Sequence, residues 1–134
     1  MTLQALRQGL ATNLATISGL RTSAFVPDNP TPPIAIVIPR GVTFDTTFHR
    51  GADEYRFDIF VIAQRAAERS AQATLDSFCN PSGSSSVKAA VESDPTLSGA
   101  AFDTRVTEMT SYGPVAIGET QYLSATFSVS VIAN

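Results

Sequence analysis

The stretch TQYLSATFSVSVIAN, residues 120–134, alternates apolar and polar side chains with a period of two. Every second residue from Leu123 onward is apolar: Leu123, Ala125, Phe127, Val129, Val131 and Ala133. Such alternation is typical of a β-strand that packs one face against a core. The stretch therefore predicts a sheet whose last strand has one buried face.

Small hydroxyl residues occupy the other face of this strand, here called the serine face: Ser124, Thr126, Ser128 and Ser130. A solvated strand face usually carries Lys or Glu, because an uncharged edge strand invites pairing with other chains. The serine face carries no charge and has no such protection, so we expect something to cover it. Another subunit, the protein's own helices and partial solvation remain open as alternatives.

Apolar residues at spacings of three and four predict two longer helices. Residues 2–18 carry the first stripe, with Thr2 as N-cap and Gly19 just past the end: Leu3, Leu6, Leu10, Leu14 and Ile17. Residues 66–79 carry the second inward face: Ala67, Ala71, Leu75 and Phe78. Residues 87–93 form a shorter helix, which Ser85 or Ser86 caps.

The remaining patterns predict strands at 21–25, 34–38, 54–63 and 101–112. Pro39 and Gly41 end the second of these, residues 42–48 form a further strand or an extended arm, and residues 113–119 form a turn. In the 54–63 strand, the face opposite the core begins charged and ends with Phe60 and Ile62, which indicates a second covering layer there. In the 101–112 strand, Phe102, Thr104 and Val106 share one face, but Met109 stands at an odd position and would point to the other face. We therefore expect a β-bulge near Thr107 or Glu108, which would shift the alternation by one residue.

This order of elements predicts an α+β fold, a mainly antiparallel β-sheet with an N-terminal helix and one or two further helices packed on one side. The length of 134 residues and the lack of an internal repeat indicate one domain, residues 1–134. No apolar run is long enough to span a membrane, and the first residues do not have the pattern of a signal peptide. A net charge of −3 without a basic cluster argues against nucleic-acid binding through phosphate contacts.

Catalytic and metal-binding patterns are missing from the sequence. One histidine, His49, and one cysteine, Cys79, cannot form a site with several His and Cys ligands. The nearest acidic cluster, Asp53, Glu54 and Asp58, is divided between the two faces of a strand and suits a hard cation poorly. Cys79 lies at the end of an apolar helix face and is expected to be a buried thiol. We expect no enzyme activity, no metal and no cofactor.

Two C-terminal stretches resemble the tail terminator proteins of long-tailed actinobacteriophages. These are VKAAVESDPTLSGAAFDTRVTEMTSYG at residues 87–113 and IGETQYLSATFSVSV at residues 117–131. The shared features are a short helix, an Asp94-x-x-Leu97-x-Gly99 turn, a strand, and a Tyr122-Leu123 pair that opens the final strand. The first half agrees in the order of its elements, so the resemblance covers nearly the whole chain.

The resemblance implies a structural protein that forms a homo-hexameric ring on the tail tube, ends tube polymerisation and joins the tail to the DNA-filled head. Its implied partners are copies of itself, the tail tube protein and the head–tail connector or stopper protein. DNA would pass through the lumen without specific binding, and the protein would reside at the tail–neck junction of the virion after assembly in the host cytoplasm. Another head–tail connector protein is the nearest alternative, and a small-ligand-binding α+β domain is a more remote one.

Two regions are the candidate subunit interface. The first is the serine face. The second is the polar 40–53 segment, which is long for a simple turn and is expected to reach a neighbour or the tube as an arm: Arg40, Asp45, His49, Arg50 and Asp53. The family contributes no catalytic residues, and its interface residues are not transferred position by position.

Overall fold

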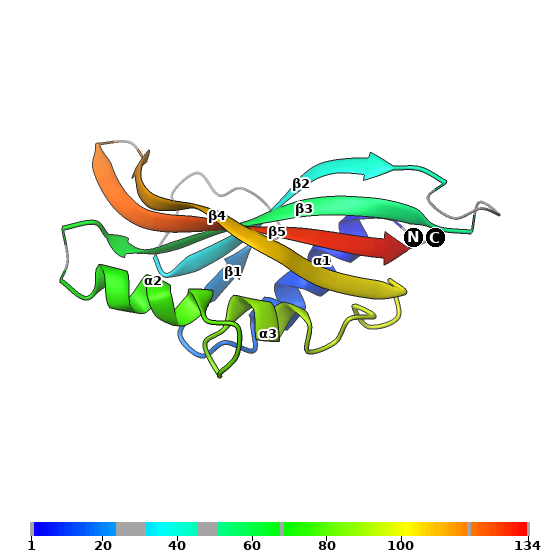
Figure 1. Cartoon of the computed structure of the whole chain (residues 1–134), viewed down its shortest axis with the longest axis horizontal. Helices are drawn as coiled ribbons and strands as arrows, with labels where there is room; N and C mark the ends of the chain where they lie inside the picture. The colour runs from blue at the N-terminus through cyan, green and yellow to red at the C-terminus, as the bar shows by residue number, and fades with distance from the viewer. Residues whose placement is uncertain (1, 24–31, 46–50, 68, 118, 134) are drawn as a thin grey trace.

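Five strands form one sheet in the order β1-β2-β3-β5-β4, and three helices lie on one side of it (Figure 1). The computed structural model describes residues 2–23, 32–45, 51–67, 69–117 and 119–133. Its elements are α1 Leu3–Leu14, β1 Arg21–Ser23, β2 Ile34–Thr43, β3 Asp53–Arg65, α2 Ala71–Cys79, α3 Val87–Val91, β4 Asp103–Ile117 and β5 Thr120–Ala133. Only the β1–β2 pair is parallel among these strands. The predicted α+β class and the one-sided helical layer are confirmed.

The main core lies between the helices and the inner faces of β3 and β5. From the sheet it takes every second residue of these strands, with Phe57 only 1% exposed and Ile59 fully buried. From α1 it takes Leu6, Leu10 and Leu14, all fully buried. The alternation of β5 and the stripe of α1 therefore face each other, as both patterns predict.

Helix α1 approaches the loop before β4 closely because Gly9 has no side chain. A Cβ atom added at Gly9 would lie 2.8 Å from the Cβ atom of Leu97, a distance at which one of the two must shift. Leu97 is buried and holds a positive φ of 49°. The Asp94 carboxylate fixes this turn by accepting hydrogen bonds from the hydroxyl and the N–H of Thr96 and from the N–H of Ser98.

We expect Gly9→Ala to destabilise the fold although alanine favours a helix. Alanine gains about 1 kcal/mol of helix propensity over glycine, whereas overpacking a core costs about 1–3 kcal/mol. The buried turn at Leu97 cannot move aside cheaply, so the clash should prevail by about 1 kcal/mol. Urea denaturation measures the difference, with Gln8→Ala on the exposed side of α1 as control. A Gly9→Ala protein as stable as the wild type would contradict this packing.

Strand β2 is longer than the sequence predicts and includes part of the expected arm. It continues past Pro39 to Thr43, which pairs with Glu54 of β3. The register shifts between Pro39 and Gly41, so Arg40 is the extra residue of a bulge. A proline and a glycine thus interrupt the ladder without ending the strand. The prediction that they end it is wrong.

The β4–β5 hairpin is also longer than expected. Residues 113–117, predicted as a turn, belong to β4 and pair with Thr120–Ser124 of β5. Pro114 is tolerated because β4 is an edge strand, whose outer side needs no ladder hydrogen bonds. The predicted bulge is confirmed by a register shift between Val106 and Glu108, and a second shift lies between Thr110 and Gly113. Phe102 precedes β4 and is 59% exposed, so its predicted place on the face of Thr104 is wrong.

Helix α2 begins later than its apolar pattern suggests. Strand β3 runs on to Arg65, which pairs with Tyr122, and the turn that follows leaves Ala67 exposed. The buried residues of α2 are Ala71, Leu75 and Phe78, as predicted. The N–H of Ala66 still donates to the carbonyl of Gln121 in β5, and a turn follows, so the helix begins only at Ala71.

Candidate subunit interface

The serine face lies on the side of the sheet opposite the helices. No helix among the described residues covers this side, which we call the bare face (Figure 1). Strand β5 is an interior strand, hydrogen-bonded to β3 on one side and β4 on the other. Because β5 has no free edge, edge pairing gives no reason for the serine face to be covered. The edge next to it is β4, which carries charged residues and two bulges, both of which discourage edge pairing.

The register places the serine face between rows of like charge. Ser128 lies between Asp58 of β3 and Glu108 of β4. Ser130, two residues further, lies between Arg56 and Arg105. The next row pairs Glu54 and Asp103 with Ile132. The polar end of the bare face thus carries acidic, basic and acidic bands, in which Ser128, Ser130 and Ile132 separate the like charges by two strand spacings, about 10 Å.

Ion pairs connect these bands within the chain. The Arg56 guanidinium contacts Glu54 at 3.1 Å, and that of Arg105 contacts Asp103 at 3.1 Å. Ser130 donates a hydrogen bond to the Glu54 carboxylate. Arg105 nevertheless keeps 77% of its side chain exposed. The three bands together hold four carboxylates and two guanidiniums, so they are net acidic, and they remain accessible to a partner.

A hollow of about 330 Å³ opens over the acidic and basic bands. Its floor includes Ser128 and Ser130, and its walls include Arg40 and Glu108. The small serines leave this space, because any longer side chain at either position would fill it. The described residues thus supply a hollow with charged side chains in its walls at the polar end of the bare face.

The opposite end of the bare face is apolar and closed by the chain itself. Ile34, Ile36 and Ile62 are buried there, and partly buried Ile117 and Tyr122 from the β4–β5 hairpin pack against them. Ser124 is only 3% exposed in this region and donates a hydrogen bond to the carbonyl of Gly113. Ile62 is buried as the pattern predicts, but neighbouring side chains of the same sheet face bury it, and no separate layer lies over it among the described residues. Thr126, Ser128 and Ser130 remain half-buried.

The 40–53 segment is not a free arm where the structure describes it. Arg40 turns back onto Asp58, with 3.0 Å between guanidinium and carboxylate. The N–H of Asp45 donates to the Asp53 carboxylate at 2.8 Å, which ties the end of β2 to the start of β3. His49 and Arg50 lie outside the described residues. Arg40 joins the serine face at the hollow, whereas Asp45 and Asp53 lie at the end of the sheet.

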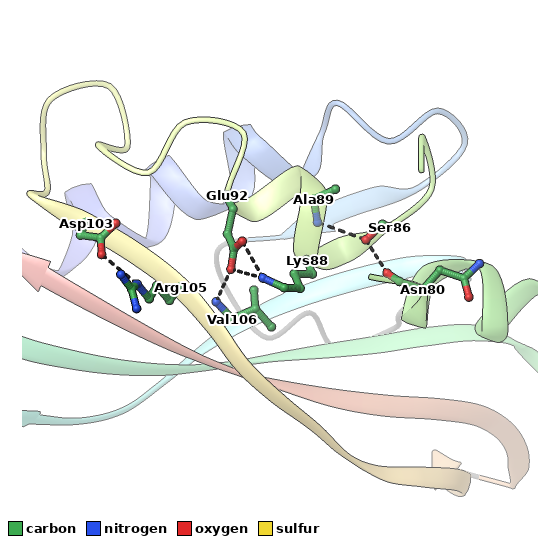
Figure 2. A network of polar contacts seen from close by, with 8 residues as sticks. All are labelled: Asn80, Ser86, Lys88, Ala89, Glu92, Asp103, Arg105 and Val106. Atoms are coloured by element: carbon green, nitrogen blue, oxygen red, sulfur yellow. Dashed lines mark hydrogen bonds and ion pairs between the residues drawn. The ribbon is translucent and has the colours of Figure 1, made fainter. Parts of the chain in front are cut away.

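A polar network on the helical side fastens α3 to the edge strand (Figure 2). Lys88 donates to both oxygens of Glu92, at 2.6 and 2.7 Å, and Glu92 accepts the N–H of Val106 at 3.0 Å. Ser86 caps α3 by accepting the N–H of Ala89, as predicted for this position. Glu92 thereby satisfies a backbone donor of β4 directly beside the first bulge.

These contacts hold the pKa of Glu92 below its ordinary value of 4.5. Burial is the largest single influence and raises the pKa, but the hydrogen bonds from Lys88 and Val106 and the charges of Lys88 and Arg105 together outweigh it. Since this pKa is lower in the folded chain than in the unfolded one, ionised Glu92 stabilises the fold above pH 4.5. That stabilisation disappears as the pH falls through the folded-state pKa.

We expect Glu92→Gln to lower the free energy of unfolding at pH 7 by up to about 1 kcal/mol, as for a partly exposed ion pair. The deficit relative to the wild type should shrink as the pH falls below 4.5. Urea denaturation at a series of pH values measures both effects, with Glu119→Gln as the control that removes an exposed carboxylate. A deficit that is constant across this range would show that the Lys88–Glu92–Val106 contacts contribute nothing.

Cys79 is a poor nucleophile in this fold. The thiol is half-buried, and burial, followed by the negative charge of Asp76, raises its pKa to about 11. Since the thiolate is the reactive species, we expect maleimide labelling at pH 7 to be much slower in the folded chain than in urea. Equal labelling rates in both states would contradict the described environment of Cys79.

Clustered metal ligands and membrane-spanning helices are both missing from the described part of the chain. Within it, no three His, Cys, Asp or Glu residues gather as a metal site would require. None of its helices has the length and apolar composition needed to cross a membrane. A hollow of about 630 Å³ lies beside the α3–β4 network, and its lining includes two ion pairs, Lys88–Glu92 and Arg105–Asp103.

No protein-family model matches the chain, and no curated protein matches it significantly.

Proposed function

We propose that this chain is a tail terminator, a structural protein that forms a hexameric ring on the phage tail tube. The ring ends tube polymerisation and joins the tail to the head–tail connector, and DNA passes through its lumen. The proposal rests on the resemblance of residues 87–131, and the bare face is the observation that supports it most. An accessible surface with alternating acidic and basic bands, and with small residues between the charges, suits a specific protein contact.

Several features of this surface fit assembly better than ligand binding. Half of the residues that line the hollow over Ser128 and Ser130 are charged, whereas small-molecule sites are usually lined by apolar side chains with few polar groups. The exposed charged side chains of this surface, such as Arg56 and Arg105, favour the solubility of a lone subunit. The net charge of −3 also suits a conduit through which DNA moves without adhering.

A contact that builds a ring is heterologous, so each subunit uses two different patches. We assign the bare face around Ser128 to one of them. The small hydroxyls allow close approach, and the acidic and basic bands fix the register of the neighbour.

Deletion of the gene in its phage or prophage genome tests the function directly. We expect particles without the chain to have tails of uncontrolled length that fail to join heads, and expression from a plasmid should restore normal tails. Electron microscopy of the lysates measures tail length. Tails of normal length attached to heads, or a gene that lacks portal, capsid and tube genes nearby, would contradict the proposal. Normal-length tails without heads would favour a stopper or another connector protein instead.

A further inference from the structure

The outer edge of β4 changes character along the strand. After Val106 it contains both bulges and Pro114, which interrupt a ladder and discourage pairing with another chain. The stretch Asp103–Val106 has neither feature, and its register with β5 is continuous. This regular stretch of the edge therefore depends on other contacts for its protection.

The side chain of Glu92 covers a backbone donor in this regular stretch (Figure 2). The N–H of Val106 donates to a Glu92 oxygen at 3.0 Å, and because this acceptor follows α3 and does not belong to β5, the donor points to the free side of β4. Lys88 donates to both oxygens of Glu92 and holds the carboxylate in place. A strand that added to β4 would need the same donor.

Space for an added chain lies beside the same stretch. The hollow of about 630 Å³ next to the α3–β4 network is lined by five consecutive residues of the strand, Asp103–Thr107. A hollow lined in this way runs along the strand, as a groove for an extended chain does. Its lining also includes Lys88, Glu92 and Pro95. The groove is open to an extended chain, but its donor at Val106 is already taken.

We propose that the Glu92 carboxylate is an autoinhibitory contact that keeps the β4 edge from adding a strand. Without this carboxylate, the β4 edge of one copy pairs with the β4 edge of a second copy. The contact acts in the isolated chain and does not depend on a place in a phage tail.

A second copy is the fitting partner because it brings the same long edge. The other edge strand, β1, offers only three described residues, Arg21–Ser23. A two-fold axis through Thr104 would pair two antiparallel β4 strands and place Asp103 opposite Arg105 on both sides of the axis. These side chains already pair within one chain, so the dimer would exchange this ion pair without like-charge repulsion and gain backbone hydrogen bonds.

Sedimentation velocity of the purified chain over a range of concentrations tests the proposal. We expect Glu92→Ala to form a concentration-dependent dimer that the wild type does not form under the same conditions. The matched control is Asp103→Ala, which removes an equal charge and one ion pair from the same surface but leaves the Glu92–Val106 contact in place, and it should sediment like the wild type. Wild-type sedimentation of Glu92→Ala, or equal dimerisation of the control, would overturn the proposal.

Amide hydrogen exchange at Val106, followed by NMR, identifies the surface that pairs. In dilute Glu92→Ala this N–H should exchange several-fold faster than in the wild type, and its exchange should slow again as the concentration rises and the edges pair. A dimer in which Val106 stays unprotected would use another surface. Unchanged exchange in the dilute variant would show that Glu92 does not cover the donor. Either result would contradict the proposed role of Glu92.

Two further substitutions at position 92 separate the hydrogen bond from charge and packing. Glu92→Met keeps a long side chain but has no oxygen to accept the Val106 N–H, so it should dimerise as Glu92→Ala does. Glu92→Gln keeps an acceptor oxygen and should stay closer to the wild type. Circular dichroism checks that each variant is folded. Equal dimerisation of the Met and Gln variants would mean that the charge of Glu92, and not its hydrogen bond to Val106, protects the edge, which would overturn the proposal.

Discussion

Replacing Phe57 with alanine should destabilise the monomer by about 3–5 kcal/mol, as expected for a phenylalanine removed from a packed core. Phe57 is 1% exposed and lies at the centre of the core between β3, β5 and the helices. Domains of this size have only about 5–15 kcal/mol of stability, so the variant should lose a large part of it. The melting temperature and the urea midpoint measure the loss.

The matched control is Phe102→Ala, which removes the same side chain from a position that is 59% exposed. It should change the free energy of unfolding by less than about 0.5 kcal/mol. A Phe57→Ala protein that differs from the wild type as little as this control would show that the inner face of β3 is assigned wrongly.

Replacing Ser128 with arginine should abolish control of tail length and leave the fold intact. The new guanidinium would lie between Asp58 and Glu108, so the isolated subunit gains favourable neighbours on both adjacent strands. It would also fill the hollow over Ser128 and place a bulky charge where the neighbouring subunit is proposed to sit. We therefore expect an unchanged melting temperature together with tails of uncontrolled length.

Two further arginine substitutions distinguish a blocked subunit contact from the effects of an added surface charge and of lost monomer stability. Ala73→Arg adds the same charge on the exposed face of α2, and tails should keep their normal length. Ser130→Arg would place arginine between Arg56 and Arg105, so we expect it to lower the stability of the monomer itself. Normal capping by Ser128→Arg would mean that the bare face stays solvated in the assembly. Loss of the monomer fold in Ser128→Arg would mean that the face is closed within the chain.

The local patterns predict most of the fold because each depends on near neighbours in the sequence. The alternation of β5, the stripe of α1 and the parity break at Met109 each identify an element or a bulge that the structure contains. The predictions are wrong where pairing between strands that are distant in the sequence determines where a strand ends. Strand β2 passes through Pro39, and β3 extends into residues with helix propensity, because β5 and neighbouring strands provide ladder partners there.

In the candidate interface, too, local sequence patterns predict some features, and long-range strand pairing determines the others. The sequence identifies the serine face as small and uncharged, but it cannot show that β5 is an interior strand. The charge bands arise from residues far apart in the chain, such as Asp58 and Glu108, which only the register brings to either side of Ser128. The bulge predicted at Thr107 or Glu108 is the one sequence signal for the position of Glu108. A bulge there shifts the alternation and can place Glu108 on the bare face.

Counting and locating copies of the chain on isolated tails tests the central proposal most directly. Cryo-electron microscopy of tails, with the chain identified by its fold in the density, makes this measurement. The proposal predicts a single closed ring of six copies at the head-proximal end of each tube, with the bare face around Ser128 covered by the adjacent subunit. Copies distributed along the tube, a different position in the particle, or a ring in which the bare face is open to solvent would contradict it.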